Sequence, residues 1–503
     1  MKRKLTECSS IGKMMILIGL MVSAPAAILP FYPQDFPYLW AFLLPGCGSI
    51  LLGIFACRFG HRDSDGFSSW RATVSHSSLT VLFVWLWGVF IGALPFVFGH
   101  QLTMVQALFE AVSGWTTTGL SAMDVSITPM VYLFHRSFMQ YCGGLGFVMM
   151  MIVIISNKHS MDLYSAEGHP DKLMPNIKKT SRAIFLIYNV CLVLGTIAYH
   201  VAGMTWFDGI CHSMCSLSTG GFSTKLASIG AYDSLSIEII TIVLMLIGTT
   251  NFAALLLFAK GKFKSFFRVS EVRFMFGLLA FFIPITALSL ADGLGISFLE
   301  GLRKASFDVV SALSTSGYST MSYAEWPALA IGVLILMMFI GGGIGSTAGG
   351  LKISRAYLML RMAGTNIKRR LSPRNDVEAP YYVKAQGKTP IDRDLADDTF
   401  GFFTTYFVIF ITGSLLITVT ADCSLTEAMF DFASSLGTVG LSIGITGPMT
   451  NNATLIIEMI GMLLGRLEIF IVFTGIVSGF QNIRSFFTKK QNAHKAHRLT
   501  AKL

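Results

Sequence analysis

The stretch FDVVSALSTSGYS at residues 307–319 decides the fold, because three close variants of it lie elsewhere along the chain. The variants are FEAVSGWTTTGLS (109–121), CHSMCSLSTGGFS (211–223) and FDFASSLGTVGLS (430–442). All four end in Thr-x-Gly, an apolar residue and Ser, and each lies between two long apolar segments. Internal repeats set the architecture of a chain. We therefore predict four copies of a unit made of a helix, a short re-entrant helix, a Thr-x-Gly loop and a second helix.

The composition places these units in a membrane. The chain has 503 residues, of which 53% are hydrophobic and 13% charged, and its mean hydropathy is +0.63, whereas about 25% of residues are charged in soluble domains. The net charge of +10 comes from Lys and Arg gathered in a few polar segments between apolar ones, the pattern of the cytoplasmic side of a membrane protein. It does not indicate nucleic acid as a partner.

Ten apolar segments are long enough to cross a bilayer core of about 30 Å as helices. They are residues 14–31, 39–59, 78–98, 129–156, 183–200, 237–258, 274–290, 328–360, 401–420 and 453–479. The sequence thus predicts an all-α polytopic protein of the cytoplasmic (inner) membrane, with both termini in the cytoplasm. We interpret the first segment as a retained helix rather than a signal peptide.

The predicted divisions follow from the repeats. They are an N-terminal helix pair (1–75), pore repeat 1 (76–160), pore repeat 2 (161–262), pore repeat 3 with a glycine-rich loop and a cytoplasmic segment (263–396), pore repeat 4 (397–485) and a basic cytoplasmic tail (486–503). The four repeats are expected to surround one pore.

Four Thr-x-Gly loops suit a site for a monovalent cation. Irregular backbone at membrane depth is tolerated only where it is buried in protein or lines a watery cavity, so the loops should face one another. Glycine allows backbone angles that direct carbonyls inward, and a ring of carbonyls replaces the hydration shell of potassium in channel filters. The short helices would also direct the negative ends of their dipoles at the ion.

An acidic residue lies nine residues before the loop glycine in three of the repeats. These residues are Glu110, Asp308 and Asp431, and His212 takes the equivalent place in the second repeat. Two interpretations stay open. The carboxylates either cap and compensate helix starts or attract cations at an outer mouth.

A second motif, GGGIGSTAGG at residues 341–350, interrupts the apolar segment 328–360. Each glycine disfavours helix by about 1 kcal/mol relative to alanine, so we predict an unwound or bent segment here. A phosphate-binding loop is excluded because the Gly-Lys-Ser/Thr sequence is missing and no strand precedes it. A tight helix-packing surface of small residues is the alternative.

Arg466 lies near the middle of the last apolar segment, and an intramembrane charge usually faces a cavity or a partner. We predict that it restricts ion flow together with the glycine-rich segment. The alternative is a structural arginine bonded to carbonyls, such as those of the glycine-rich segment itself. Glu468 lies off its helical face, so a local pair is not expected. Arg136 is interpreted as interfacial or structural, with no transport role.

These motifs, with QYCGGLGF (140–147), GGGIGSTAGGLKISR (341–355) and GRLEIF (465–470), resemble the TrkH/KtrB superfamily of potassium-uptake proteins over nearly the whole chain. The additional N-terminal helix pair is similar to the TrkH branch. The resemblance implies a potassium filter lined by Thr117, Thr118, Gly119, Thr219, Gly220, Gly221, Thr315, Ser316, Gly317, Thr438, Val439 and Gly440. It implies a gate formed by Gly341, Gly342, Gly343, Gly345, Ser346, Thr347, Gly349, Gly350 and Arg466.

The resemblance also bears on selectivity and partners. Sodium-conducting relatives commonly carry Ser in the first loop, so Gly119 favours potassium, whereas Gly437 and Val439 depart from the other loops and could loosen selectivity. A homodimer and a cytoplasmic nucleotide-binding regulatory protein are implied, besides the lipid bilayer. Potassium is expected as the substrate, with no covalently bound cofactor and no transition-metal site.

Other function classes remain as alternatives. A secondary transporter of another solute also has broken helices and internal repeats, and a less selective potassium and sodium pathway fits the same loops. Channel and proton or sodium symport are both left open. An enzyme is not expected, because the sequence shows no metal-ligand cluster and no paired catalytic carboxylates.

Overall fold

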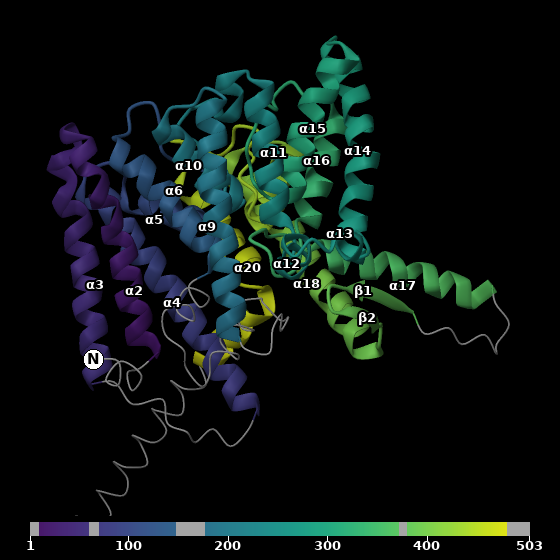
Figure 1. The fold of residues 1–503 in the computed structure, drawn as a ribbon, viewed down its shortest axis with the longest axis horizontal. Coiled ribbons are helices and arrows are strands. Elements are labelled where there is room, and N and C mark those ends of the chain that lie inside the picture. Colours follow the sequence, from purple (N-terminus) through teal and green to yellow (C-terminus); the bar gives the residue numbers. More distant parts are fainter. Residues whose placement is uncertain (1–9, 60–69, 147–176, 372–379, 480–503) are drawn as a thin grey trace, which may run out of the picture.

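The computed structural model describes residues 10–59, 70–146, 177–371 and 380–479, and it is predominantly helical (Figure 1). The helices of the first half are α2 (Ser10–Ser23), α3 (Leu39–Phe59), α4 (Trp70–Phe98), α5 (Met104–Trp115), α6 (Met130–Leu145), α9 (Ile177–Val201), α10 (Trp206–Leu217), α11 (Leu235–Thr249) and α12 (Phe252–Ala259), with the 3₁₀ helices η1 (Ala24–Phe31), η2 (Pro33–Tyr38) and η3 (Ser228–Tyr232). Those of the second half are α13 (Phe263–Phe266), α14 (Ser270–Leu294), α15 (Phe298–Ser314), α16 (Ala328–Ile340), α17 (Ile353–Leu371), α18 (Arg393–Ala421), α19 (Leu425–Gly437) and α20 (Asn452–Arg466). The described strands are β1 (Tyr381–Lys384) and β2 (Gly387–Pro390).

The described residues include six helical segments long and apolar enough to cross a membrane, or seven if the bent pair α11 and α12 is one span. The count of ten is not reached because several predicted spans are not continuous helices. The axis bends by 115° between α11 and α12. The segments 328–360 and 453–479 are likewise interrupted, after Ile340 and after Arg466. The span 129–156 extends beyond the described residues, and its helix ends at Leu145.

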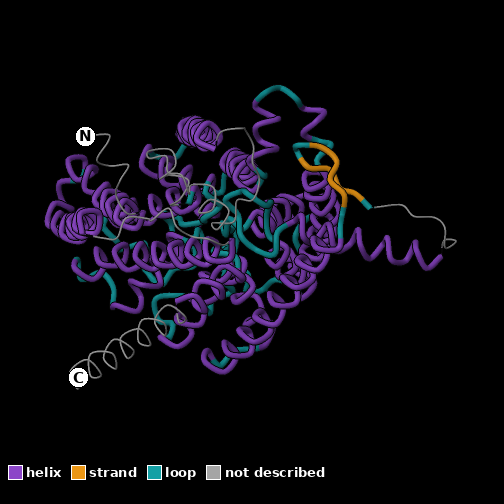
Figure 2. Tube along the Cα trace, turned by 90° about the horizontal axis from the view of Figure 1, so that it is seen from below, coloured by secondary structure: helices purple, strands orange, loops and turns teal. Residues whose placement is uncertain are grey.

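Four short helices, α5, α10, α15 and α19, pack between long ones. Each contacts the helix before it and the helix after it, in the sets α4–α5–α6, α9–α10–α11, α14–α15–α16 and α18–α19–α20. The last helix of each set also contacts the short helix of the next set, and α20 contacts α5. The four sets therefore close into a ring. Loops gather among the helices near the centre of the molecule (Figure 2).

Hydroxyl side chains start all four short helices. The N-cap residues Thr103, Thr205, Ser297 and Ser424 have extended backbones. An N-cap oxygen satisfies one of the backbone N–H groups that the first turn leaves unpaired. Ser424 Oγ, for example, accepts from the N–H of Glu427, and the Glu427 carboxylate accepts from the Ser424 N–H. These caps fix where each short helix begins.

Two features lie outside the ring. The pair α2 and α3 packs on one side of it, on α4, and appears at the left edge of Figure 1. On the opposite side α17 projects from the body, beside the antiparallel hairpin β1–β2. The Val383 N–H of this hairpin donates to Ser270 Oγ at 3.0 Å, which attaches the hairpin to the first residue of α14. The sequence did not predict the hairpin.

Candidate functional site

The four Thr-x-Gly segments share one backbone conformation. The threonines Thr117, Thr219, Thr315 and Thr438 all have left-handed φ, of 56°, 52°, 56° and 50°. The glycines Gly119, Gly221, Gly317 and Gly440 have φ of 99°, 74°, 75° and 104°. A left-handed β-branched residue is strained by roughly 1–3 kcal/mol and persists only where its surroundings impose it. The same strain at four equivalent positions points to a functional constraint.

The end of each short helix holds the turn that follows. In each turn, the residue between Thr and Gly donates its N–H to a carbonyl five residues back in the helix. The bonds are Thr118 to Ser113 (2.9 Å), Gly220 to Cys215 (2.8 Å), Ser316 to Ser311 (2.9 Å) and Val439 to Ser434 (2.7 Å). The four turns are therefore held in the same way by four separate helices.

The four turns meet in a closed order. A Cβ placed on each glycine would lie closer than 3.0 Å to a carbonyl oxygen of the neighbouring turn, a separation that real Cβ atoms essentially never show. Gly119 faces Gly220 O, Gly221 faces Ser316 O, Gly317 faces Val439 O, and Gly440 faces Thr118 O. Glycine is therefore required at these positions both by its positive φ and by the approach of a neighbouring backbone.

The surroundings of this ring favour a cation. The short helices end within one or two residues of the threonines, so the negative ends of four helix dipoles converge there. The four threonine side chains are fully buried. The ring therefore combines buried hydroxyl groups with four converging negative helix ends.

The acidic residues at equivalent places in three of the short helices fit neither predicted role. Glu110, Asp308 and Asp431 have no exposed surface and lie well inside their helices, so they neither cap helix starts nor line an outer mouth. Their carboxylates accept the N–H of the third residue after each glycine, in Ala122 (2.7 Å), Thr320 (3.4 Å) and Ile443 (2.9 Å). His212 Nε2 instead lies 3.0 Å from Ser223 Oγ. These groups hold the segment that leaves each turn.

The glycine-rich segment lies directly against the turns. The predicted break is confirmed, because no helix is present between Ile340 and Ile353, and Gly341, Gly345 and Gly350 have positive φ. Its contacts reach three of the four turn threonines. Thr347 Oγ1 lies 3.1 Å from Thr219 Oγ1, the Gly349 N–H donates to Thr315 Oγ1 at 3.0 Å, and a Cβ on Gly349 would collide with Thr438 Oγ1.

Neighbouring helices also hold the segment in place. The N–H groups of Gly343 and Thr347 donate to the carbonyls of Thr249 and Gly248, at 3.0 and 3.2 Å. The Ile344 N–H donates to Glu271 Oε1 at 2.7 Å. The unwound segment is thus bonded to the end of α11 and to the start of α14.

Arg466 joins the glycine-rich segment to the first repeat. Its Nη1 donates to Thr347 O at 2.5 Å and its Nη2 to Gly143 O at 2.6 Å. Arg466 is therefore bonded to a carbonyl of the glycine-rich segment and to a carbonyl of the first repeat, an arrangement compatible with both predicted roles. Glu468 pairs with Arg355 at 2.8 Å rather than with Arg466; the prediction of no local pair holds, although the reason differs, because the helix ends at Arg466.

A helix also ends at the matching place in each of the other three sets, where the sequence predicted that it would continue. Gly146 ends α6 with φ of 79°, Thr250 separates α11 from α12, and Glu468 follows α20 with φ of 59°. Signals were present at two of them, in the glycines of QYCGGLGF and in Asn251, whose side chain caps α12 by accepting the Ala253 N–H. The apolar run alone suggested continuity.

Arg136 is a second functional candidate, for which the sequence prediction left an interfacial and a structural position open. Its side chain is 2% exposed, so it is not interfacial, and it pairs with Glu110 beside the first turn. The sequence analysis applied to Arg466 the rule that an intramembrane charge usually faces a partner. The same rule applied to Arg136 would have predicted a buried partner for it.

Comparison with known proteins gives a consistent result. The family described as "TrkH: Cation transport protein" matches residues 61–479. The Trk system potassium uptake protein TrkH of Vibrio parahaemolyticus is 31% identical over 487 residues, covering 92% of this chain and 96% of that protein. The protein of the same name from Halomonas elongata is 33% identical over 414 residues, covering 78% and 83%.

The solved structures agree with the sequences. The crystal structure of the potassium transporter TrkH from Vibrio parahaemolyticus matches with a TM-score of 0.78 and 27% identity, covering 93% of this chain and 98% of that one. Together with the apolar helices, these matches identify a multi-pass cell-membrane protein from a family of transporters and not of enzymes. The chain belongs to the TrkH family of cation transport proteins.

Proposed function

We propose that this protein takes up potassium across the cell membrane through a gated pore lined by the four Thr-x-Gly turns. The observation that carries the proposal is the closed ring of four turns with identical backbone handedness, each at the negative end of a short helix. The relatives are named potassium uptake proteins, which supports potassium as the ion.

The proposed filter consists of the twelve predicted turn residues, from Thr117–Gly119, Thr219–Gly221, Thr315–Gly317 and Thr438–Gly440. Left-handed and ordinary φ alternate along each turn, and this alternation turns successive carbonyls toward the same side of the chain. Four such rows of oxygen atoms replace the water shell of a monovalent cation. Val439 contributes through its backbone, so its missing hydroxyl leaves the ring of carbonyls complete.

The proposed gate is the glycine-rich segment between α16 and α17, with Arg466. The segment touches three turn threonines, so it lies at one end of the ring and across the ion path. A guanidinium beside a path for cations raises the barrier to their passage. Glycines give the segment the conformational freedom to move aside.

Partners and orientation complete the proposal. Lys368, Arg369 and Arg370 lie in the last turn of α17, which projects from the body, and basic residues favour the cytoplasmic side. We place both termini and this face in the cytoplasm, with a homodimer as the assembly and a nucleotide-binding regulatory protein docked there. The alternative is a pathway shared by potassium and sodium. A measurement of ion selectivity distinguishes it from a potassium-selective pore.

The decisive experiment measures uptake in cells that lack their own potassium transport. The protein should restore growth at limiting potassium and admit rubidium, a potassium analogue, in preference to sodium. A Gly119→Ser variant should admit sodium more readily, because its side chain would meet Gly220 O in a backbone conformation that side chains rarely adopt. Equal entry of rubidium and sodium through the unaltered protein would contradict the filter.

Glu271→Gln tests the attachment of the glycine-rich segment. The Glu271 carboxylate accepts the Ile344 N–H at 2.7 Å, and bonds to a charged acceptor are about twice as strong as neutral ones. We expect the neutral amide to loosen the segment and raise the initial rate of rubidium uptake by about threefold, since ~0.7 kcal/mol gives that change. A matched control is Glu300→Gln, whose backbone is capped by Ser297 at the exposed start of α15. Lower uptake in the Glu271 variant alone would contradict this role.

A further inference from the structure

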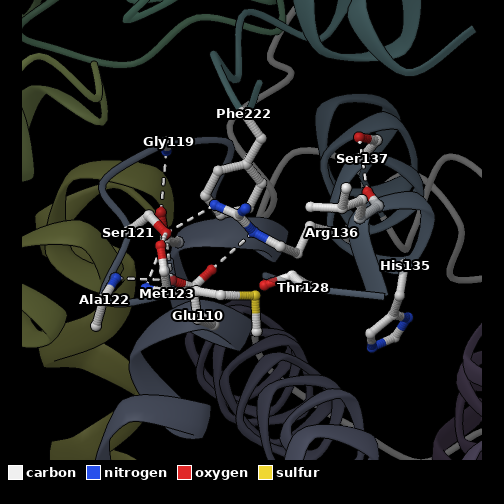
Figure 3. Close-up of polar contacts among 12 residues, drawn as sticks. Glu110, Gly119, Ser121, Ala122, Met123, Thr128, His135, Arg136, Ser137 and Phe222 are labelled. Atoms are coloured by element: carbon white, nitrogen blue, oxygen red, sulfur yellow. Dashed lines mark hydrogen bonds and ion pairs between the residues drawn. The ribbon is translucent and has the colours of Figure 1, made fainter. Parts of the chain in front are cut away.

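A buried ion pair lies directly behind the first turn (Figure 3). Arg136 Nε is 3.0 Å from Glu110 Oε2, and the two side chains are 2% and 0% exposed. Breaking such a pair leaves a charge uncompensated in a low-dielectric interior. In the folded protein, separating the two side chains would therefore be energetically costly.

The pair holds the chain that leaves the first turn. Ser121 donates its hydroxyl to Glu110 Oε1 at 2.6 Å and accepts from Arg136 Nη2 at 2.8 Å. The Ala122 N–H donates to the same carboxylate oxygen at 2.7 Å. Ser121 is two residues beyond Gly119, so this network holds in place the segment that follows the first turn (Figure 3).

The same face of α6 also holds the second turn. The Arg136 guanidinium lies 4.0 Å from the centre of the Phe222 ring, at cation–π distance. Gln140, one helical turn further on, donates from Nε2 to Gly220 O at 2.5 Å and accepts the Phe222 N–H at 3.1 Å. Arg136 therefore links the residues that leave the first turn to those that leave the second, and Gln140 on the same helix holds the second turn.

The equivalent groups of the other repeats act within their own turns. Asp308 accepts from Thr320 and Tyr323, and Asp431 from Ser442, Ile443 and Thr446. Within the described residues neither carboxylate has a basic partner within ion-pair distance. Among the residues that the structure describes, a basic side chain links two turns only behind the first turn, where Arg136 lies.

We propose that Arg136 and Gln140 are positioning residues that fix the spacing between the first two turns and thereby set the preference for potassium over sodium. The proposal rests on the proposed function, because it assumes that the ring of turns is the filter. A ring of oxygens discriminates between ions by the number and placement of its ligands. The guanidinium makes an ion pair, a hydrogen bond and a ring contact at once, and a lysine ammonium cannot reproduce that fork.

The test uses the full-length protein in liposomes and measures the ratio of rubidium to sodium uptake. Arg136→Lys keeps the charge beside Glu110, so it limits damage to folding. We expect its uptake ratio to fall by about tenfold, equivalent to ~1.4 kcal/mol of lost discrimination. Gln140→Met removes the amide at similar volume without creating a buried charge, and its ratio should fall as well. Thermal unfolding midpoints of all variants show whether the protein is folded.

Arg303→Lys is the matched control. Arg303 pairs with Glu238 at 2.8 Å and with Asp233 at 3.1 Å, and both partners lie outside the turns. The control should keep the uptake ratio of the unaltered protein. If Arg136→Lys does not fold, Gln140→Met decides the question.

The outcomes separate the two proposals. An unaltered protein that does not discriminate between the ions contradicts the proposed function. A selective unaltered protein with equally selective Arg136→Lys and Gln140→Met variants overturns only the positioning role. Variants that lose total uptake while keeping the ratio overturn it too, because support of the fold alone would then explain them.

Discussion

Gly317→Ala is expected to lower rubidium uptake by about a hundredfold. The added methyl group would lie closer than 3.0 Å to Val439 O and to Gly440 Cα, both of which are backbone atoms that cannot turn aside. The φ of 75° at this position adds strain, and a total of ~3 kcal/mol of strain corresponds to roughly two factors of ten in rate. The measurement is the initial rate of uptake by purified protein in liposomes.

Gly332→Ala is the matched control for this prediction. Gly332 lies in α16, in the helix that follows the same turn, and no atom lies within 4 Å of the position that its Cβ would take. Its uptake should equal that of the unaltered protein, and its helix should be slightly more stable, by up to ~1 kcal/mol. Uptake by Gly317→Ala that matched the control would show that the third turn does not contact the ion path.

Arg466→Ala is expected to change uptake in the opposite direction, raising the initial rate by about tenfold. Two unit charges about 4 Å apart repel by ~4 kcal/mol at an effective dielectric constant of 20, and the bonded carbonyls offset part of this. The substitution removes the charge and also the bonds that hold Thr347 to Gly143. Both effects lower the barrier that the proposed gate imposes.

Two further variants separate charge from attachment. Arg466→Lys keeps the charge but loses the bidentate fork, so its uptake should lie between those of the alanine variant and the unaltered protein. A shorter linker in place of residues 343–346 removes the segment's bond to Glu271 and should raise uptake while Arg466 is kept. Unchanged uptake in both Arg466→Ala and the shortened variant would contradict the gate.

The chemistry of individual segments was predictable from local sequence. Four Thr-x-Gly copies between apolar runs indicated four turns, and the structure gives all four threonines the same left-handed φ. The glycines of residues 341–350 indicated a broken helix, because adjacent glycines disfavour helix whatever surrounds them. The break is present between Ile340 and Ile353. These features depend on conformational preferences of neighbouring residues, which the sequence displays directly.

Partners of buried polar groups were not predictable in this way. Glu110, Asp308 and Asp431 looked like helix-start residues, but a carboxylate nine residues from a glycine shows nothing of the hydroxyl and N–H groups that fold back onto it. For Arg136 the sequence left an interfacial and a structural position open. Its pairing with Glu110 depends on the packing of α5 against α6.

The sequence by itself determined that this protein is a helical membrane protein with four similar turns and one glycine-rich break, since periodicity, apolar length and glycine content are local properties. Only the tertiary structure decided the order in which the turns meet and what covers them. Thr219 and Thr347 touch across 128 residues, and Arg466 reaches Gly143 across 323. Such contacts follow from how whole helices pack in three dimensions, which no single stretch of the chain specifies.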